Sequence, residues 1–424
     1  MINNFLSIRD LVVSRTAKDT SILFIGNGAS AILGIIFTIL AARFLGPGAW
    51  GIVAGVTSLI VILASIADLG LGSSIFRFLS KEWVKDKNST QEIYKTIVFL
   101  RAASAILLSL FLILISRWFA PLIFQSTNSL LVVFTAIGVL GVLLVDLQIV
   151  TFQAKQNWGK AALFIAMTNI LRLAFLLGLV LTGTVNLLTV LSAFVLSMLA
   201  TWVISLVWQR VPLGIPNNWF VLSKKVFSFS KWMAGNQAVS AVNSRIDVLL
   251  LLNIVGSVNA GIYGAASRIA LGFPLIVGSF ATVLASRFAS ISQKHELFAF
   301  FKKSIGLSVL LASSLILGVL AAPVITLFLG KAYESSTQVL QWLLISFIPF
   351  TLSTPAVNIL IYRFNKPYII TILSFVSLPI IVFGNIFLIP AIGILAPAFI
   401  LAFTNTLTLA VTYFFVWREF KKLV

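Results

Sequence analysis

Cysteine is missing from this sequence, histidine occurs once, and acidic residues are few. The 424 residues include 11 Asp or Glu against 30 Lys or Arg, which gives a formal net charge of +19 at pH 7. Without cysteine the chain has no disulfide and no thiol chemistry. The single histidine, His295, lies in the polar stretch SISQKHELF and cannot hold a metal ion alone. We therefore expect no metal site and no cofactor, with H⁺ or Na⁺ left open as a coupling ion.

Charge of either sign is scarce. Only 10% of the residues are charged, whereas a soluble protein carries about 25%. Hydrophobic residues make up 60% of the chain, and the mean hydropathy is +1.09. These values predict an all-α integral membrane protein. No polar stretch is long enough for a soluble domain, and no phosphate-binding glycine loop is present, which excludes an ATPase or a soluble glycosyltransferase domain.

Long apolar runs occupy most of the sequence. About 20 apolar residues cross a bilayer as a helix, and by this measure we expect about twelve transmembrane helices. Their approximate ranges are 21–43, 50–73, 94–118, 129–151, 160–182, 187–208, 228–254, 262–285, 303–328, 337–361, 367–389 and 393–417. Residues 1–20 precede the first span, and their apolar positions can form one face of a short interfacial helix.

The cations indicate the orientation. Of the 30 Lys and Arg residues, 23 lie at the termini or in loops on one side, and only Arg43, Arg117 and Lys331 lie on the other. Because cytoplasmic loops carry the excess of positive charge, both termini are expected in the cytoplasm of a plasma (inner) membrane protein. Contact with anionic lipid, rather than with nucleic acid, explains this charge.

An internal repeat divides the chain. LGPGAWGIVAG at 45–55 is echoed by VGSVNAGIYGA at 255–265, and RFLS at 77–80 by RFAS at 287–290, both 210 residues apart. We expect two parallel six-helix repeats, at 21–212 and 213–424. Such bundles leave a cavity between them, and in transporters the repeat interface usually holds the substrate site.

Seven charged residues fall inside the expected spans, where an unpaired charge costs roughly 2.5–3.5 kcal/mol. Two antiparallel helices bring residues level when they are equally far from the turn. This geometry brings Asp68, Arg101 and Asp146 into one charge network and pairs Asp247 with Arg268 across the next hairpin. The network can equally be a structural ion cluster that locks the helices together.

The remaining intramembrane cations are candidates for substrate contact. Arg245 points away from its neighbour Asp247, because two residues turn a helix by about 200°, so it can face the cavity. We assign substrate binding to a set of four residues, with the alternative that they only bridge helices. These are Arg245, Arg268, Arg172 and Asn243. Three further arginines are expected to extend to the cytoplasmic mouth: Arg77, Arg287 and Arg363.

Two stretches resemble a known family. FLGPGAWGIVAGVTSLIVILASIADLGLGSSIFRFLS and SRIDVLLLLNIVGSVNAGIYGAASRI look like the first and the seventh-to-eighth hairpins of polysaccharide flippases in the multidrug/oligosaccharidyl-lipid/polysaccharide exporter superfamily. The positions that match its pattern are Asp68, Arg77, Asp247, Gly261, Tyr263 and Arg268. The resemblance implies a MATE-like fold and a flippase that moves a polyprenyl-pyrophosphate-linked oligosaccharide to the outer leaflet. Its partners would be membrane lipid, the lipid-linked glycan and polysaccharide polymerase or export machinery.

Three other functions stay open. A drug or small-cation antiporter of the same fold would favour a net acidic cavity, whereas here four intramembrane Arg residues oppose three Asp residues. A membrane-embedded glycan polymerase or ligase usually needs a large outer loop, and the outer loops are short, so we expect a transporter rather than an enzyme. A membrane scaffold without transport activity is the third alternative.

The orientation can be tested with reporter fusions. Fusions at Gly183 and Val258 should report an external position, and fusions at Lys87 and Lys224 a cytoplasmic one, because of the asymmetry of the loop cations. Reversed signals at two of these four sites would contradict the twelve-span topology.

Overall fold

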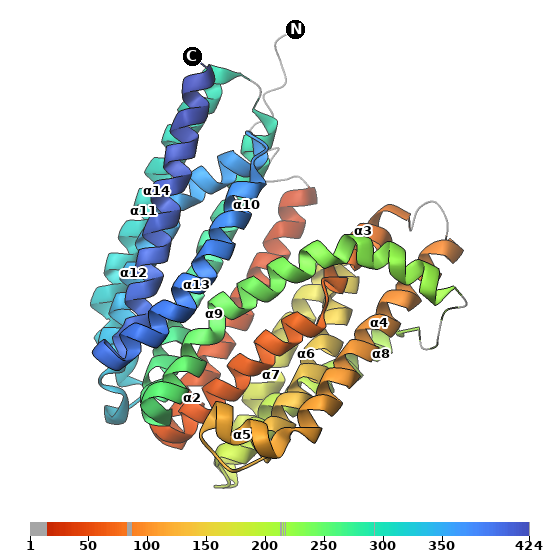
Figure 1. Cartoon of the computed structure of the whole chain (residues 1–424), viewed down its shortest axis with the longest axis vertical. Helices are drawn as coiled ribbons and strands as arrows, with labels where there is room; N and C mark the ends of the chain where they lie inside the picture. Colours follow the sequence, from red (N-terminus) through yellow and green to blue (C-terminus); the bar gives the residue numbers. More distant parts are fainter. Residues whose placement is uncertain are drawn as a thin grey trace. The chain divides into compact units, whose positions relative to one another are not determined.

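The computed structural model describes residues 15–82, 87–212, 214, 216, 218–291 and 293–423. Every regular element in this part of the chain is a helix (Figure 1), which confirms the all-α prediction. Most of the expected interfacial segment, residues 1–14, lies outside the described residues.

The helices up to the middle of the chain are α2 (Arg15–Ala67), α3 (Leu71–Glu82), α4 (Lys87–Leu114), α5 (Ser116–Phe124), α6 (Leu130–Ala154), α7 (Trp158–Leu181) and α8 (Leu187–Trp208). Those that follow are α9 (Trp219–Ala270), α10 (Gly272–Ser290), α11 (Lys294–Leu327), η1 (Lys331–Tyr333), α12 (Ser336–Tyr362), α13 (Pro367–Ile392), η2 (Gly393–Leu395) and α14 (Ala396–Leu423).

The apolar helices are long enough to cross a membrane many times. Within the described residues, 9 helical stretches have the length and composition of a span. Three of them, Ile22–Ala67, Trp219–Ala289 and Pro367–Lys422, contain 46, 71 and 56 residues. Since about 20 residues suffice for one crossing, each of these can cross more than once. The chain is a multi-pass membrane protein, and the count of twelve crossings stays a prediction.

Two glycines break the longest helices at equivalent points of the repeat. Gly46 in α2 has φ 74° and ψ 168°, and Gly256 in α9 has φ 86° and ψ 172°. Glycine is the residue that adopts positive φ without a steric penalty. The two positions are 210 residues apart, the offset that the sequence repeat has. The repeat is therefore present in the backbone conformation as well as in the sequence.

A second pair of repeat-related glycines forms a close helix crossing. A Cβ atom on Gly51 would collide with the Ser257 carbonyl and the Gly261 nitrogen. Conversely, a Cβ atom on Gly261 would collide with the Pro47 carbonyl and the Gly51 nitrogen. The contact is reciprocal, because Pro47 and Ser257 are also 210 residues apart. Small residues permit such close backbone approach between membrane helices.

The described chain forms two compact units. The first contains the described residues up to Phe37, together with Leu63–Ile115 and Val132–Gln237; the second contains Thr38–Ile62, Ser116–Leu131 and the chain from Ala238 onward. The glycine crossing lies within the second unit. The predicted division at residues 212 and 213 follows the sequence repeat instead, and it stays a prediction.

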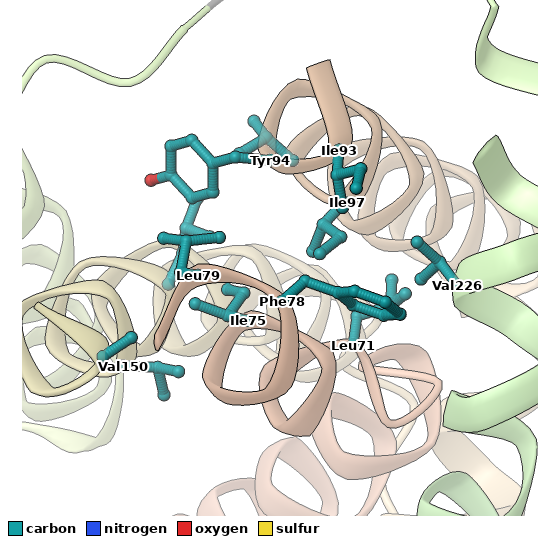
Figure 2. Close-up of a cluster of buried hydrophobic side chains, with 12 residues drawn as sticks. Leu71, Ile75, Phe78, Leu79, Ile93, Tyr94, Ile97, Val150 and Val226 are labelled. Carbon is teal, nitrogen blue, oxygen red and sulfur yellow. The ribbon is translucent and has the colours of Figure 1, made fainter. Parts of the chain in front are cut away.

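The first unit has an apolar cluster at one end of its helices. Leu71, Ile75 and Leu79 recur every four residues on α3 and so share one face. Figure 2 shows this face against Ile93 and Ile97 of α4, with Val150 and Val226 beside it. All these side chains are buried, so the cluster fixes α3 against α4, α6 and α9.

The glycine crossing can be tested by adding one methyl group. Gly51→Ala and Gly261→Ala should each destabilise the protein by about 1–3 kcal/mol, because the new Cβ overpacks against backbone. The control is Gly278→Ala in α10, where a Cβ would meet no atom within 4 Å. The control should be stabilising by up to about 1 kcal/mol, since alanine favours helix. Thermal unfolding in detergent micelles measures all three, and equal midpoints would contradict the close crossing.

Candidate functional site

A cavity in the second unit collects several of the polar residues singled out in the sequence. Its volume is about 160 Å³, and its walls come from α9, α12, α13 and α14. Arg245 and Asp247 are the charged side chains among its lining residues, and Asn243, Tyr263 and Asn385 line it as well. The cavity is smaller than the roughly 300–1,000 Å³ of a pocket for a drug-sized ligand. It fits a small charged group with some water.

Tyr263 reaches the Asp247 carboxylate within α9. The Tyr263 hydroxyl donates a hydrogen bond to Asp247 Oδ2, and the Val248 backbone N–H donates to Asp247 Oδ1 at 2.8 Å. In a straight helix, residues 16 positions apart would be about 24 Å apart. The break at Gly256 therefore folds α9 back on itself and brings the two side chains together. Tyr263 is buried, with 1% of its surface exposed.

The expected pair between Asp247 and Arg268 does not form. Asp247 bonds to Tyr263, and the Arg268 Nη2 donates a hydrogen bond to Thr57 Oγ1 of α2. Equal distance from the turn sets depth but not direction. Arg268 follows Tyr263 by five residues, which rotates it about 140° around the helix axis. Tyr263 faces Asp247, and Arg268 is thereby directed to another helix.

Arg245 is a cation without a bonded counter-ion. Among the residues that the structure describes, none is hydrogen-bonded to or ion-paired with its guanidinium. Asp247 and Tyr263 are the charged or ionisable groups that act on it electrostatically. The side chain is partly buried and lines the cavity. Arg245 can thus offer its N–H groups to an anion in the cavity.

Two buried amides leave acceptors unused in the cavity. Asn243 donates its Nδ2 to the Ser374 carbonyl at 3.3 Å, and Asn385 donates to the Ile381 carbonyl at 2.8 Å. The Oδ1 atoms of both amides are buried and have no hydrogen-bond partner. Asn243 was expected at this site. Asn385 and the structural role of Tyr263 were missed, because the hairpin argument considered only charged residues.

The structure brings the expected charge network together in the first unit. Arg101 Nη2 of α4 lies 2.9 Å from Asp68 Oδ1 and 2.5 Å from Asp146 Oδ2 of α6. Asp68 Oδ2 also accepts the Gly72 N–H at 3.2 Å, which satisfies the start of α3. Arg101 is 3% exposed, whereas 46% of the Asp146 side chain is accessible. This triad holds the break between α2 and α3 in place.

Arg172 occupies a different environment in the first unit. Its guanidinium lies over the Phe194 ring at 3.9 Å and near the Phe37 ring at 5.7 Å. Its Nη1 donates to Asn169 Oδ1 at 2.9 Å, and Asn169 in turn donates to Ser30 Oγ at 2.6 Å. Arg172 does not line the cavity. Arg172 is thus stabilised by cation–π contacts and by a hydrogen-bonded amide instead of a carboxylate. Substrate contact by Arg172 stays a prediction.

The three arginines expected at the cytoplasmic mouth lie at or near helix ends. Arg287 is in the last turn of α10, and Arg363 follows α12 directly. Cations there complement the partial negative charge of the helix C-terminus. Arg77 of α3 is exposed and lies over the Phe229 ring of α9 at 4.3 Å.

One loop cation of the first unit has a shifted pKa. Lys155 follows α6 directly, and its pKa lies below the usual range, because the surrounding protein partly desolvates the ammonium and Lys160 adds a like charge.

The family follows from the sequence match. The model of the family described as polysaccharide biosynthesis protein matches residues 16–292, more than half of the chain. The chain belongs to this family. No curated protein matches it.

Solved structures of the multidrug/oligosaccharidyl-lipid/polysaccharide (MOP) superfamily share the fold of this family member. The lipid II flippase MurJ in an inward closed conformation has a TM-score of 0.71 at 15% identity, over 94% of this chain and 89% of that one. A multidrug resistance MATE transporter in an outward-facing conformation has a TM-score of 0.65 at 15% identity, over 96% of both chains. A MOP transporter from Pyrococcus furiosus has a TM-score of 0.66 at 14% identity, over 96% of both chains. The fold is MATE-like, as the resemblance implied.

The charge triad predicts an order of stabilities. Arg101→Ala should destabilise the protein by about 3–5 kcal/mol, because it leaves the buried Asp68 carboxylate without a cation. Asp146→Asn should cost less, since Asp68 keeps its partner and the Asp146 side chain is half accessible. Unfolding in detergent micelles checks the order. Equal losses in the two variants would show that the triad is not the source of the stability.

Proposed function

We propose that this protein is a flippase that moves a polyprenyl-pyrophosphate-linked oligosaccharide from the inner to the outer leaflet by alternating access, in polysaccharide biosynthesis. Arg245 binds the pyrophosphate. The protein acts in the plasma (inner) membrane with both termini in the cytoplasm, and polysaccharide polymerase or export machinery receives its product.

One observation carries the proposal: Arg245 lines an intramembrane cavity and has no bonded counter-ion among the described residues. A guanidinium inside a membrane needs water or an anion to offset its cost. Its planar N–H groups match phosphate oxygens in bidentate geometry. An anionic headgroup on a lipid is the ligand that satisfies both conditions.

The other polar atoms of the cavity suit the same ligand. Asn243 and Asn385 also line the cavity, and each has an Oδ1 atom without a hydrogen-bond partner. A side-chain rotation can turn these oxygens towards water molecules that hydrate the pyrophosphate. The volume of about 160 Å³ restricts the cavity to the charged linkage, so the glycan and the lipid tail must lie outside it. Membership of a polysaccharide biosynthesis family and the shared fold of a lipid II flippase support this substrate class.

A drug or small-cation antiporter is the second candidate. It is favoured by Asp247 and by the unpartnered amide oxygens, which are ligands for a cation, and multidrug transporters share the fold. Arg245 in the same cavity opposes this function, because it repels a cation. Uptake of a lipophilic cation into proteoliposomes under a proton gradient would favour the antiporter.

Proteoliposomes with a fluorescent polyprenyl-pyrophosphate-linked oligosaccharide test the flippase. Arg245→Ala should abolish translocation, measured as exposure of the label to an external quencher, while expression and membrane insertion remain normal. Arg245→Lys should restore part of the activity, since an ammonium keeps the charge but loses the bidentate geometry. Arg210→Ala is the control, because Arg210 is an exposed cation that does not line the cavity. Full activity of a well-inserted Arg245→Ala protein would reject the role of Arg245.

A further inference from the structure

We infer that Tyr263 is a positioning residue that holds the Asp247 carboxylate away from Arg245 and so keeps the cavity selective for anions. This inference rests on the proposed role of Arg245 in binding pyrophosphate. It adds a residue that sets the specificity of the same site without touching the substrate phosphate.

Each oxygen of the Asp247 carboxylate accepts a hydrogen bond from a neutral donor. Oδ1 accepts the Val248 N–H at 2.8 Å, and Oδ2 accepts the Tyr263 hydroxyl. Hydrogen bonds to an ionised acceptor are stronger than those between neutral groups. The carboxylate would have to give up the hydrogen bond from Tyr263 in order to turn towards another donor.

Arg245 is the donor that Asp247 would otherwise take. The two side chains line the same cavity and are its charged members. No ion pair joins them, although each acts electrostatically on the other. Residues two apart on a helix do not face each other directly, but here both side chains line the same cavity. A carboxylate released from Tyr263 can therefore turn towards the unbonded guanidinium within the cavity and form a charge-assisted pair. The pair would occupy the N–H groups that the substrate needs.

The backbone fold of α9 determines this arrangement of Tyr263 and Asp247. The break at Gly256 returns α9 on itself and places Tyr263 beside Asp247. Tyr263 is 1% exposed, so its ring cannot swing away from the carboxylate. The selectivity of the cavity thus depends on a single phenolic hydroxyl.

Binding of farnesyl pyrophosphate to the full chain in lipid nanodiscs tests the inference. Tyr263→Phe should weaken binding about tenfold or more, because Asp247 then competes with the phosphate for Arg245. Asp247→Asn should bind at least as tightly as the wild type. The double variant Tyr263→Phe/Asp247→Asn should recover wild-type affinity within about threefold, since the competing charge is absent. A purely structural role of Tyr263 predicts no such rescue.

Tyr333→Phe is the matched control. Tyr333 is also 1% exposed in the second unit, and its hydroxyl donates to the Ala42 carbonyl at 2.9 Å, but it does not line the cavity. Its loss removes a buried tyrosine hydroxyl without freeing a carboxylate, so the affinity should not change. Wild-type affinity of Tyr263→Phe, or failure of the double variant to recover, overturns the inference.

The proposed function fails in a different way. If Arg245→Gln binds farnesyl pyrophosphate as tightly as the wild type, Arg245 is not the phosphate ligand. If Arg245→Gln loses binding while Tyr263→Phe does not, the phosphate ligand stands and the role of Tyr263 is rejected.

Discussion

Charge inside hydrocarbon is the constraint on which the polar structure of this protein depends. Within the described residues, the intramembrane ions are stabilised in different ways. Arg101 pairs with two carboxylates, Arg172 contacts aromatic faces and an amide, and Asp247 accepts a hydrogen bond from a phenol. Arg245 has no bonded partner among the described residues, and it lines a cavity together with Asp247. In the proposed anion site, the cation stays unpaired while the competing carboxylate is held in other hydrogen bonds.

The helix breaks are what make these pairings possible. Tyr263 meets Asp247 because α9 reverses at Gly256, and Asp68 meets Arg101 and Asp146 where α2 gives way to α3. Between α2 and α3 the backbone departs from regular helix directly beside the Asp68 carboxylate, whose Oδ2 accepts the Gly72 N–H. Non-helical backbone at membrane depth needs polar partners, since lipid offers none. The Asp68 carboxylate thus satisfies backbone at the break between α2 and α3 and also pairs with Arg101.

The sequence predicted the fold class and much of the polar network, because hydrophobic length and distance from a turn are properties of the chain itself. These two measures found the triad of Asp68, Arg101 and Asp146. They failed for Asp247 and Arg268, since depth along a helix does not give the direction around it. They predict no partner for Arg172, because it contacts an aromatic ring and an amide rather than a charged residue at the same depth. The sequence alone does not show which neutral side chains, such as Tyr263 and Asn385, lie in the cavity, because this depends on how the helices pack.

The reciprocal crossing of Gly51 and Gly261 carries a consequence for the origin of the chain. Each glycine meets the backbone of the other repeat at the equivalent residue, so one surface pairs with a second copy of itself. Isologous interfaces of symmetric homodimers have this property. An ancestral protein of a single repeat with one such glycine could already have dimerised in the membrane. Fusion of two copies would then have joined a working interface, and each half could afterwards diverge everywhere except at the crossing.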